Sequence, residues 1–207
     1  MDDLAALASA TPAAALIFLA FVAASLIGLY AAPAMIERNL FRPYWWWRQR
    51  EYATPVSSAF LHGDLPHLIF NGFTFWSFAF PLERAIGSGR FVALYAFGLA
   101  VSTAGTWLAH RRDPNYRTLG ASGAILAVLF AAIVYVPSSS IFMFPIPVPV
   151  PAPVFAVLYL GYCWWASRQP RGGINHDAHL AGALAGIAFV ALVDAPALGR
   201  AWRYVFA

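Results

Sequence analysis

The sequence predicts an all-α integral membrane protein, and three observations support this fold class. Of the 207 residues, 61% are hydrophobic. Only 11% are charged, far fewer than a soluble domain carries. Several uninterrupted apolar runs are long enough to cross the hydrocarbon core of a bilayer. These runs leave no segment for a separate soluble domain, so we expect one membrane-embedded domain over residues 1–207.

Six apolar runs predict six transmembrane helices. Thr11 and Asp64 are predicted N-caps of the first two helices, and each is followed by a proline in the first turn. The third helix follows a short polar connection, and the fourth begins at a glycine-rich motif. The predicted spans are residues 12–32, 65–82, 90–110, 120–136, 154–167 and 176–193.

Two connections are long. Residues 33–65 contain Tyr44, three consecutive tryptophans and several arginines, a mixture typical of a membrane interface. A structureless loop of this length would be unusual, so we expect short helices lying partly among the lipid headgroups. The other connection has prolines at positions 145, 147, 149, 151 and 153. Alternating proline excludes a helix and predicts a stiff, extended spacer.

The charge pattern argues against nucleic-acid binding. All 13 basic residues are arginines, and they are scattered through the predicted loops without forming a basic patch. The single cysteine, Cys163, excludes an intramolecular disulfide framework and is interpreted as a small core residue. The expected surroundings are therefore the lipid bilayer, with no nucleic-acid partner. The oligomeric state is not indicated by the sequence.

The motif that opens the fourth helix contains Gly120, Ser122 and Gly123. Alone, such a motif is common in the packing of small residues between helices. A helix over residues 120–136 would be about 25 Å long, shorter than a hydrocarbon core of about 30 Å. If its far end reaches one surface, Ser122 lies below the other surface, and the backbone before it needs protein or water around it. This predicts a water-filled pocket, with free first-turn N–H groups suited to an oxyanion.

A serine nucleophile needs a base, and the sixth predicted helix contains His179. His179, Gly182 and Gly186 lie on one helix face, because they are spaced by three and four residues. Glycines on that face allow close approach of a second helix, which could bring Ser122 to His179. Asp177 lies on roughly the opposite face and is expected to help start the helix. The pattern therefore predicts a Ser–His dyad, although a histidine bonded only to neighbouring backbone is an alternative.

The second predicted helix contains His67 and Asn71, which share a face because they are four residues apart. Both side chains can donate hydrogen bonds. Near a serine nucleophile they would form an oxyanion hole together with the backbone N–H of Ser122. On position alone, polar contacts between helices are an equally good interpretation.

Together these motifs resemble the rhomboid family of intramembrane serine proteases, over the second to the sixth span. The resemblance implies that Ser122 is the nucleophile, that His179 is the base, and that His67, Asn71 and the Ser122 amide bind the oxyanion. It also implies a six-helix core, no metal or cofactor, and a substrate that is the transmembrane segment of another protein. It rests on the motifs His62-Gly-Asp-Leu-Pro-His67-Leu-Ile-Phe-Asn71, Gly120-Ala-Ser122-Gly123 and Ala178-His179-Leu-Ala-Gly182-Ala-Leu-Ala-Gly186.

Two positions depart from the family pattern. Many rhomboids have Trp-Arg nine and eight residues before the position of His62, whereas this chain has its Trp47-Arg48 pair six residues earlier. The family also commonly has an aromatic residue at the position of Leu126, packed on the histidine. Leucine fills space but cannot stack, so we expect His179 to be oriented less tightly.

Membrane orientation and activity have alternatives. The positive-inside rule would put the first, third and fifth loops, which hold nine arginines, in the cytoplasm. The family orientation is the reverse, and we favour it, with the inner membrane of a bacterium as the expected location. One alternative function is a non-catalytic rhomboid-like protein that binds membrane clients. Another is a transporter or metal-binding channel that uses His67, His176 and His179.

Overall fold

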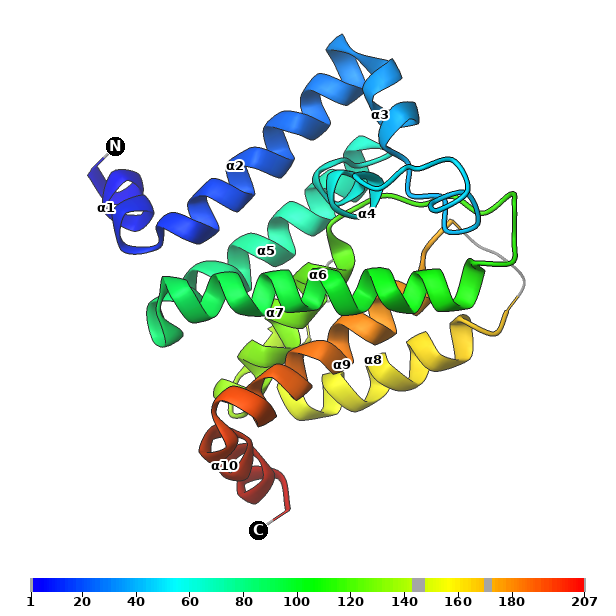
Figure 1. The fold of residues 1–207 in the computed structure, drawn as a ribbon. Coiled ribbons are helices and arrows are strands. Elements are labelled where there is room, and N and C mark those ends of the chain that lie inside the picture. The colour runs from blue at the N-terminus through cyan, green and yellow to red at the C-terminus, as the bar shows by residue number, and fades with distance from the viewer. Residues whose placement is uncertain (1, 143–147, 170–172, 207) are drawn as a thin grey trace.

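The computed structural model describes residues 2–142, 148–169 and 173–206, and its architecture is helical (Figure 1). Each predicted span overlaps one main helix. These helices are α2 (Pro12–Leu26), α5 (Leu65–Ile86), α6 (Ser88–His110), α7 (Ser122–Tyr135), α8 (Ala152–Ala166) and α9 (His176–Val193). The other described helices are α1 (Asp2–Ala10), the π-helical turn η1 (Ile27–Ala31), α3 (Pro33–Asn39), α4 (Thr54–Ser57), the 3₁₀ turn η2 (Ser58–Phe60) and α10 (Ala195–Phe206).

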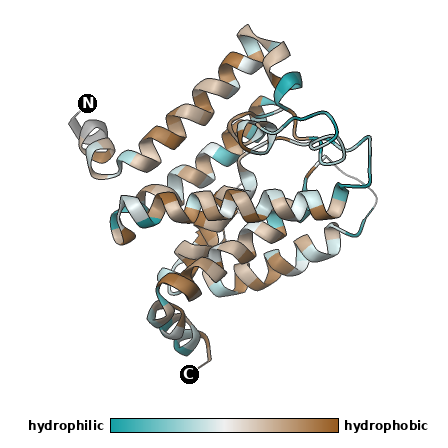
Figure 2. Cartoon of the chain, in the orientation of Figure 1, coloured by the Kyte–Doolittle hydropathy of each residue, from teal (hydrophilic) through white to brown (hydrophobic). Residues whose placement is uncertain are grey.

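The chain is a membrane protein. Within the described residues, three helical segments are long and apolar enough to cross a bilayer, namely Pro12–Ala31, Ser88–His110 and His176–Val193. Helices α7 and α8 are apolar but shorter, with 14 and 15 residues. Figure 2 shows hydrophobic residues along these helices and hydrophilic ones gathered in the connections.

Helix α7 is the buried centre of the bundle. It has no polar face after its first residue, and a helix that is apolar all round is stable only when other helices surround it. Helices α5, α6, α8, α9 and α10 all contact it. The 11 buried residues among its 14 are Gly123, Ala124, Ile125, Leu126, Ala127, Val128, Leu129, Phe130, Ala131, Ile133 and Val134.

Helix α9 lies directly against the backbone of α7. A Cβ atom added at Gly182 would overlap the carbonyl oxygen of Gly123, and one added at Gly186 would overlap the carbonyl oxygen of Ala127. The two helices therefore approach as closely as only glycine allows. The prediction that this glycine face packs on the helix that carries Ser122 is confirmed.

Glu83 joins the end of α5 to the start of α2. Its carboxylate, 1% exposed, accepts hydrogen bonds from the backbone N–H groups of Ala13 (3.1 Å) and Ala14 (2.6 Å) and from the hydroxyl of Ser88 (2.6 Å). An anion suits the free N–H groups and positive end of a helix. Thr11 occupies the N-cap position of α2, as predicted, but its hydroxyl donates to the carbonyl of Leu7 and makes no capping hydrogen bond.

The other predicted cap is confirmed. The side chain of Asp64 accepts a hydrogen bond of 2.7 Å from the backbone N–H of His67 and so starts α5. Helix α5 continues past residue 82 to Ile86, although Pro81 lies inside it. Gly87 follows as the C-cap residue, and its φ of 81° is in the region that favours glycine.

The two long connections are both folded. In the first, α3 and α4 are the expected short helices, and Phe41 pairs with Thr118 in an isolated bridge. In the second, β1 (Ser140–Phe142) and β2 (Pro149–Pro151) form an antiparallel pair. The extended backbone is confirmed, but the simple spacer is wrong, because the chain folds back on itself. Prolines 145 and 147 lie outside the described residues.

We predict that Gly182→Ala destabilises the protein by about 3 kcal/mol, because the added methyl group meets a backbone carbonyl that cannot rotate away. The measurement is denaturant-induced unfolding in mixed micelles. Gly161→Ala on α8 is the control, since no atom lies within 4 Å of the added Cβ. Its stability should stay equal or rise by up to about 1 kcal/mol. Equal losses in both variants would contradict the packing described here.

Candidate active site

Ser122 and His179 are hydrogen bonded. The Oγ atom of Ser122 lies 2.8 Å from Nε2 of His179, and both side chains are partly buried. His179 lies one turn before Gly182 on α9, so the contact between Gly182 and Gly123 brings the ring to the first turn of α7. This separation is within the range that allows direct proton transfer from a hydroxyl to an imidazole.

Gly120 allows the backbone to turn into α7. Its φ of 119° is in the region that L side chains rarely adopt. A Cβ atom at this position would also lie 2.8 Å from Cε1 of His67, too close for an ordinary contact. Its N–H donates to the carbonyl of Ser58 at 3.0 Å. Glycine therefore allows the turn by which the chain enters α7. It also leaves room for the His67 ring beside position 120, two residues before Ser122 in the chain.

The other side of the His179 ring is held by Tyr159. The Tyr159 hydroxyl lies 3.1 Å from Nδ1 of His179. The Tyr159 ring itself packs against Phe155 and Phe130, with centroid separations of 5.4 and 5.9 Å. Leu126 offers no stacking surface, and a hydrogen bond from another helix orients the ring instead.

Tyr159 was not predicted from the sequence. It lies in an apolar run on α8, with no regular spacing to His179 in the chain. The leucine at position 126 was the one available signal, since it indicated that the usual stacking partner is missing.

His67 and Asn71 are four residues apart on one face of α5, and the His67 ring lies beside Gly120. Asn71 is 8% exposed, and its Nδ2 has no hydrogen-bond partner among the described residues. A buried amide without a partner is costly, so its presence calls for a functional explanation. His67 contacts Gly120 on one side and the edge of the His62 ring on the other, with a centroid separation of 4.8 Å.

The His62 ring packs against the His67 ring and is hydrogen bonded to α2. Its Nδ1 lies 2.8 Å from the hydroxyl of Ser25, and the His62 side chain is fully buried. Burial, reinforced by the neighbouring His67, lowers the pKa of His62 to about 3. The ring is therefore neutral at physiological pH. The contact with Ser25 was not predicted, and a lone serine in an apolar span was the only signal for it.

Asp177 is not part of the hydrogen-bonded pair. Its carboxylate lies 2.9 Å from Nε2 of His110. Within the described part of the chain, no carboxylate is hydrogen bonded to His179, which matches the predicted dyad. Asp177 lies in the first turn of α9, where the prediction put it, but the N-cap is Asn175, whose side chain accepts from the N–H of Ala178 at 3.0 Å.

Trp47 and Arg48 interact within the first connection. The guanidinium of Arg48 lies 4.0 Å from the ring centroid of Tyr44 and donates to the Tyr44 carbonyl. The Trp47 ring contacts Trp46 and Tyr52. Among the described contacts, neither side chain reaches Ser122 or His179.

A small cavity lined by both polar and apolar residues lies beside Ser122. Its volume of about 30 Å³ exceeds the roughly 10–15 Å³ that one water molecule needs. Several hydroxyl groups and an amide line it and can hydrogen bond to water. This cavity fits the water-accessible pocket predicted from the short fourth helix. Its polar lining residues include Ser58, Ser102, Thr103, Thr106, Thr118 and Asn175.

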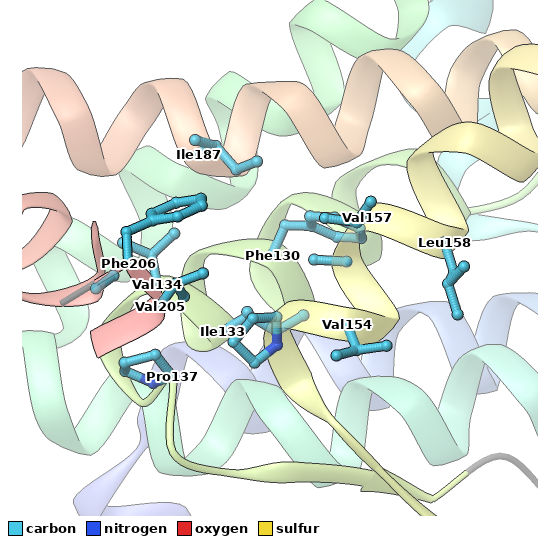
Figure 3. A pocket seen from close by; sticks show the side chains of 13 residues that line it. Phe130, Ile133, Val134, Pro137, Val154, Val157, Leu158, Ile187, Val205 and Phe206 are labelled. Carbon is cyan, nitrogen blue, oxygen red and sulfur yellow. The ribbon is translucent and has the colours of Figure 1, made fainter. Parts of the chain in front are cut away.

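A larger groove of about 470 Å³ lies at the opposite end of α7 (Figure 3). Helices α7, α8, α9 and α10 form its walls, and the side chains that line it include Phe130, Val157 and Ile187. None of its lining residues ionises, so it offers no acid–base chemistry. The candidate site is therefore the Ser122 end of α7.

Comparison with known proteins identifies the family of the chain. Residues 46–195 match the family model described as the Rhomboid domain, which covers both Ser122 and His179. The chain belongs to the rhomboid family. It is 32% identical over 163 residues to the Rhomboid protease GluP of Bacillus subtilis, an alignment that covers 79% of this chain and 29% of the relative.

Other rhomboid relatives come from bacteria and mitochondria. The Putative rhomboid protease YdcA of Bacillus subtilis is 37% identical over 83 residues, covering 40% of this chain and 38% of the relative. Rhomboid protein 1, mitochondrial, of Saccharomyces cerevisiae is 30% identical over 150 residues, covering 68% of this chain and 43% of the relative. The chain thus spans less than half the length of these relatives.

We predict that Tyr159→Phe slows the reaction of Ser122 with a fluorophosphonate by about 2–10-fold, because one hydrogen bond to His179 contributes about 0.5–1.5 kcal/mol. The measurement is the second-order labelling rate, together with the midpoint of thermal unfolding. Tyr162→Phe, on the same helix, is the control and should label like the unmodified protein. A slower rate that simply follows lost stability would argue against orientation by Tyr159.

Proposed function

We propose that the chain is a serine-type intramembrane endopeptidase that cleaves transmembrane segments of other membrane proteins. The observation that carries this proposal is the 2.8 Å hydrogen bond between Ser122 and His179 in a helical membrane bundle of the rhomboid family. In this proposal, the six main helices are the six spans of the protease core. The proposed location is the cell membrane of a bacterium.

His179 acts as the general base and then as the general acid. Its Nε2 takes the proton of Ser122 while Oγ attacks the carbonyl carbon of the scissile bond. The imidazolium then protonates the leaving amine, which leaves an acyl-enzyme. For Nε2 to accept a proton, the neutral ring must carry its proton on Nδ1. The hydroxyl of Tyr159, 3.1 Å from Nδ1, can accept that hydrogen bond and favours this tautomer.

The oxyanion is stabilised by donors from two helices. The first-turn N–H groups of α7, including that of Ser122, lie at the positive end of the helix. Asn71 contributes an amide donor without another partner, and His67 contributes a ring nitrogen. These groups stabilise the negative charge that develops on the carbonyl oxygen during attack.

The substrate class follows from the position of the serine. Ser122 begins a short helix within a membrane bundle, so the peptide bond must come to it inside or beside the bilayer. A substrate helix must unwind locally to present its carbonyl carbon, and small, helix-breaking residues near the cut would favour this. The water that releases the acyl-enzyme can be held in the small cavity beside Ser122, where hydroxyl groups are available to bind it.

The test is labelling of the purified protein in detergent with a fluorophosphonate probe. We expect labelling at Ser122 that is lost in both Ser122→Ala and His179→Ala. Ser77→Ala, which removes an exposed hydroxyl on α5, is the control and should label normally. Labelling that persists in Ser122→Ala would overturn the assignment. A folded protein that binds membrane clients but never labels would support the non-catalytic rhomboid-like function.

A second test addresses the oxyanion hole. We expect Asn71→Ala to lower kcat for a transmembrane substrate by about 100-fold, with KM changed little, because the donor is needed only in the transition state. Its stability should not fall, since Nδ2 has no partner among the described residues. Asn39→Ala, which removes an amide bonded to the Met35 carbonyl on α3, should leave kcat unchanged. A rise in KM at constant kcat would indicate substrate binding instead.

A further inference from the structure

Behind the proposed active site, three side chains form a cluster of metal-binding type. Cys163 is supplied by α8, while His176 and His179 are supplied by one face of α9. One ligand atom from each residue lies within 4.8 Å of the other two. The channel hypothesis from the sequence grouped His67 with the two histidines, whereas the structure groups Cys163 with them.

The state of these side chains indicates a ligand-binding role. Nδ1 of His176 is buried and has no hydrogen-bond partner among the described residues. Cys163 is fully buried beside it rather than among apolar side chains alone. A buried nitrogen without a partner is costly unless something binds it. Thiolate and imidazole together are the ligands that Zn²⁺ and similar soft divalent ions prefer.

We propose that Cys163, His176 and His179 bind a divalent transition-metal ion, represented by Zn²⁺, which reversibly inhibits the protease. The inhibitory effect rests on the proposed function, whereas ion binding does not. Tetrahedral zinc bonds of about 2.0–2.3 Å place ligand atoms roughly 3.3–3.7 Å apart. The observed separations of up to 4.8 Å would have to shorten on binding, by rotation of the side chains. Water would be the fourth ligand.

The ion would bind Nδ1 of His179. The other nitrogen, Nε2, is already hydrogen bonded to Ser122 at 2.8 Å. Nδ1 faces the Tyr159 hydroxyl, and the same hydroxyl interacts with the side chain of Cys163. Nδ1 is therefore the nitrogen on the Cys163 side, where an ion would take the place of the Tyr159 hydroxyl.

Binding at Nδ1 would switch off the base without moving it. On binding, the Cys163 thiol loses one proton to solvent, and the neutral His179 ring carries its single proton on Nε2 instead of Nδ1. Nε2 then donates a hydrogen bond to Ser122 and has no lone pair with which to accept the serine proton. The ion also links α8 to α9. The protease is inhibited because His179 holds its proton on Nε2, although Ser122 and His179 stay hydrogen bonded.

An ion can reach the cluster from the polar end of α9. His176 lies near the start of the helix and lines a small pocket of about 40 Å³. Polar groups of His110, Asp177 and Gln169 line the same pocket. This pocket would bring a hydrated ion to His176 without crossing the lipid-facing surface of α8.

The decisive experiment separates ion binding from catalysis. Co²⁺ is added to purified full-length Ser122→Ala protein, and its thiolate-to-metal absorption is recorded. Because Cys163 is the one cysteine in the chain, this absorption can come from no other residue. We expect it in Ser122→Ala, we expect it to be lost in Cys163→Ala, and we expect weaker Co²⁺ binding by about ten-fold or more in His176→Asn. His110→Gln removes a nearby histidine outside the cluster and should bind Co²⁺ normally.

The inhibition is measured separately on the active protein. Zn²⁺ should abolish substrate cleavage, and a chelator should restore it. Cys163→Ala and His176→Asn should keep basal cleavage but require at least about ten-fold more Zn²⁺ for half-inhibition. No thiolate absorption in Ser122→Ala, or equal Zn²⁺ sensitivity in Cys163→Ala, would overturn the metal site. Absorption with no cleavage by the unmodified protein would instead contradict only the proposed protease activity.

Discussion

The closest packing contact in the bundle is the approach of α9 to the backbone of α7. Gly182 and Gly186 leave no room for a side chain against the carbonyl groups of Gly123 and Ala127. Moving the helices apart by the width of one methyl group would exceed the reach of the hydrogen bond from Ser122 to His179. The hydrogen bond between Ser122 and His179 therefore depends on this direct contact between the two helix backbones, which sets the distance between the two side chains.

His179 is the point at which several helices meet. Ser122 on α7 binds one ring nitrogen, Tyr159 on α8 binds the other, and His176 on its own helix lies edge-on to it at a centroid separation of 5.9 Å. What occupies Nδ1 decides which nitrogen holds the proton, and so decides whether Nε2 can accept one. A hydroxyl and a metal ion at this position would have opposite effects on the same base.

Much of this arrangement is predictable from periodicity and motifs. The limits of α9, the cap by Asp64 and the glycine face of α9 all followed from local spacing, because such features depend on residues close in the chain. Tyr159, Ser25 and the partners of Asp177 did not, because each meets its partner only through packing between distant helices. The hairpin of β1 and β2 was missed for a related reason. Proline excludes a helix at those positions, but it does not show whether an extended segment pairs with another.

Polar contacts join helix α2 to the rest of the bundle near both of its ends. Near its start, the buried carboxylate of Glu83 receives its N–H groups, and near its other end Ser25 meets His62, which in turn supports His67. All of α2 precedes the segment that defines the family match. Its removal would take two backbone donors from the buried carboxylate of Glu83 and the Ser25 hydroxyl from the buried ring of His62, a large penalty in an apolar interior. Helix α2 is thus needed for the stability of the bundle. The unit that folds is longer than the segment by which the family is identified.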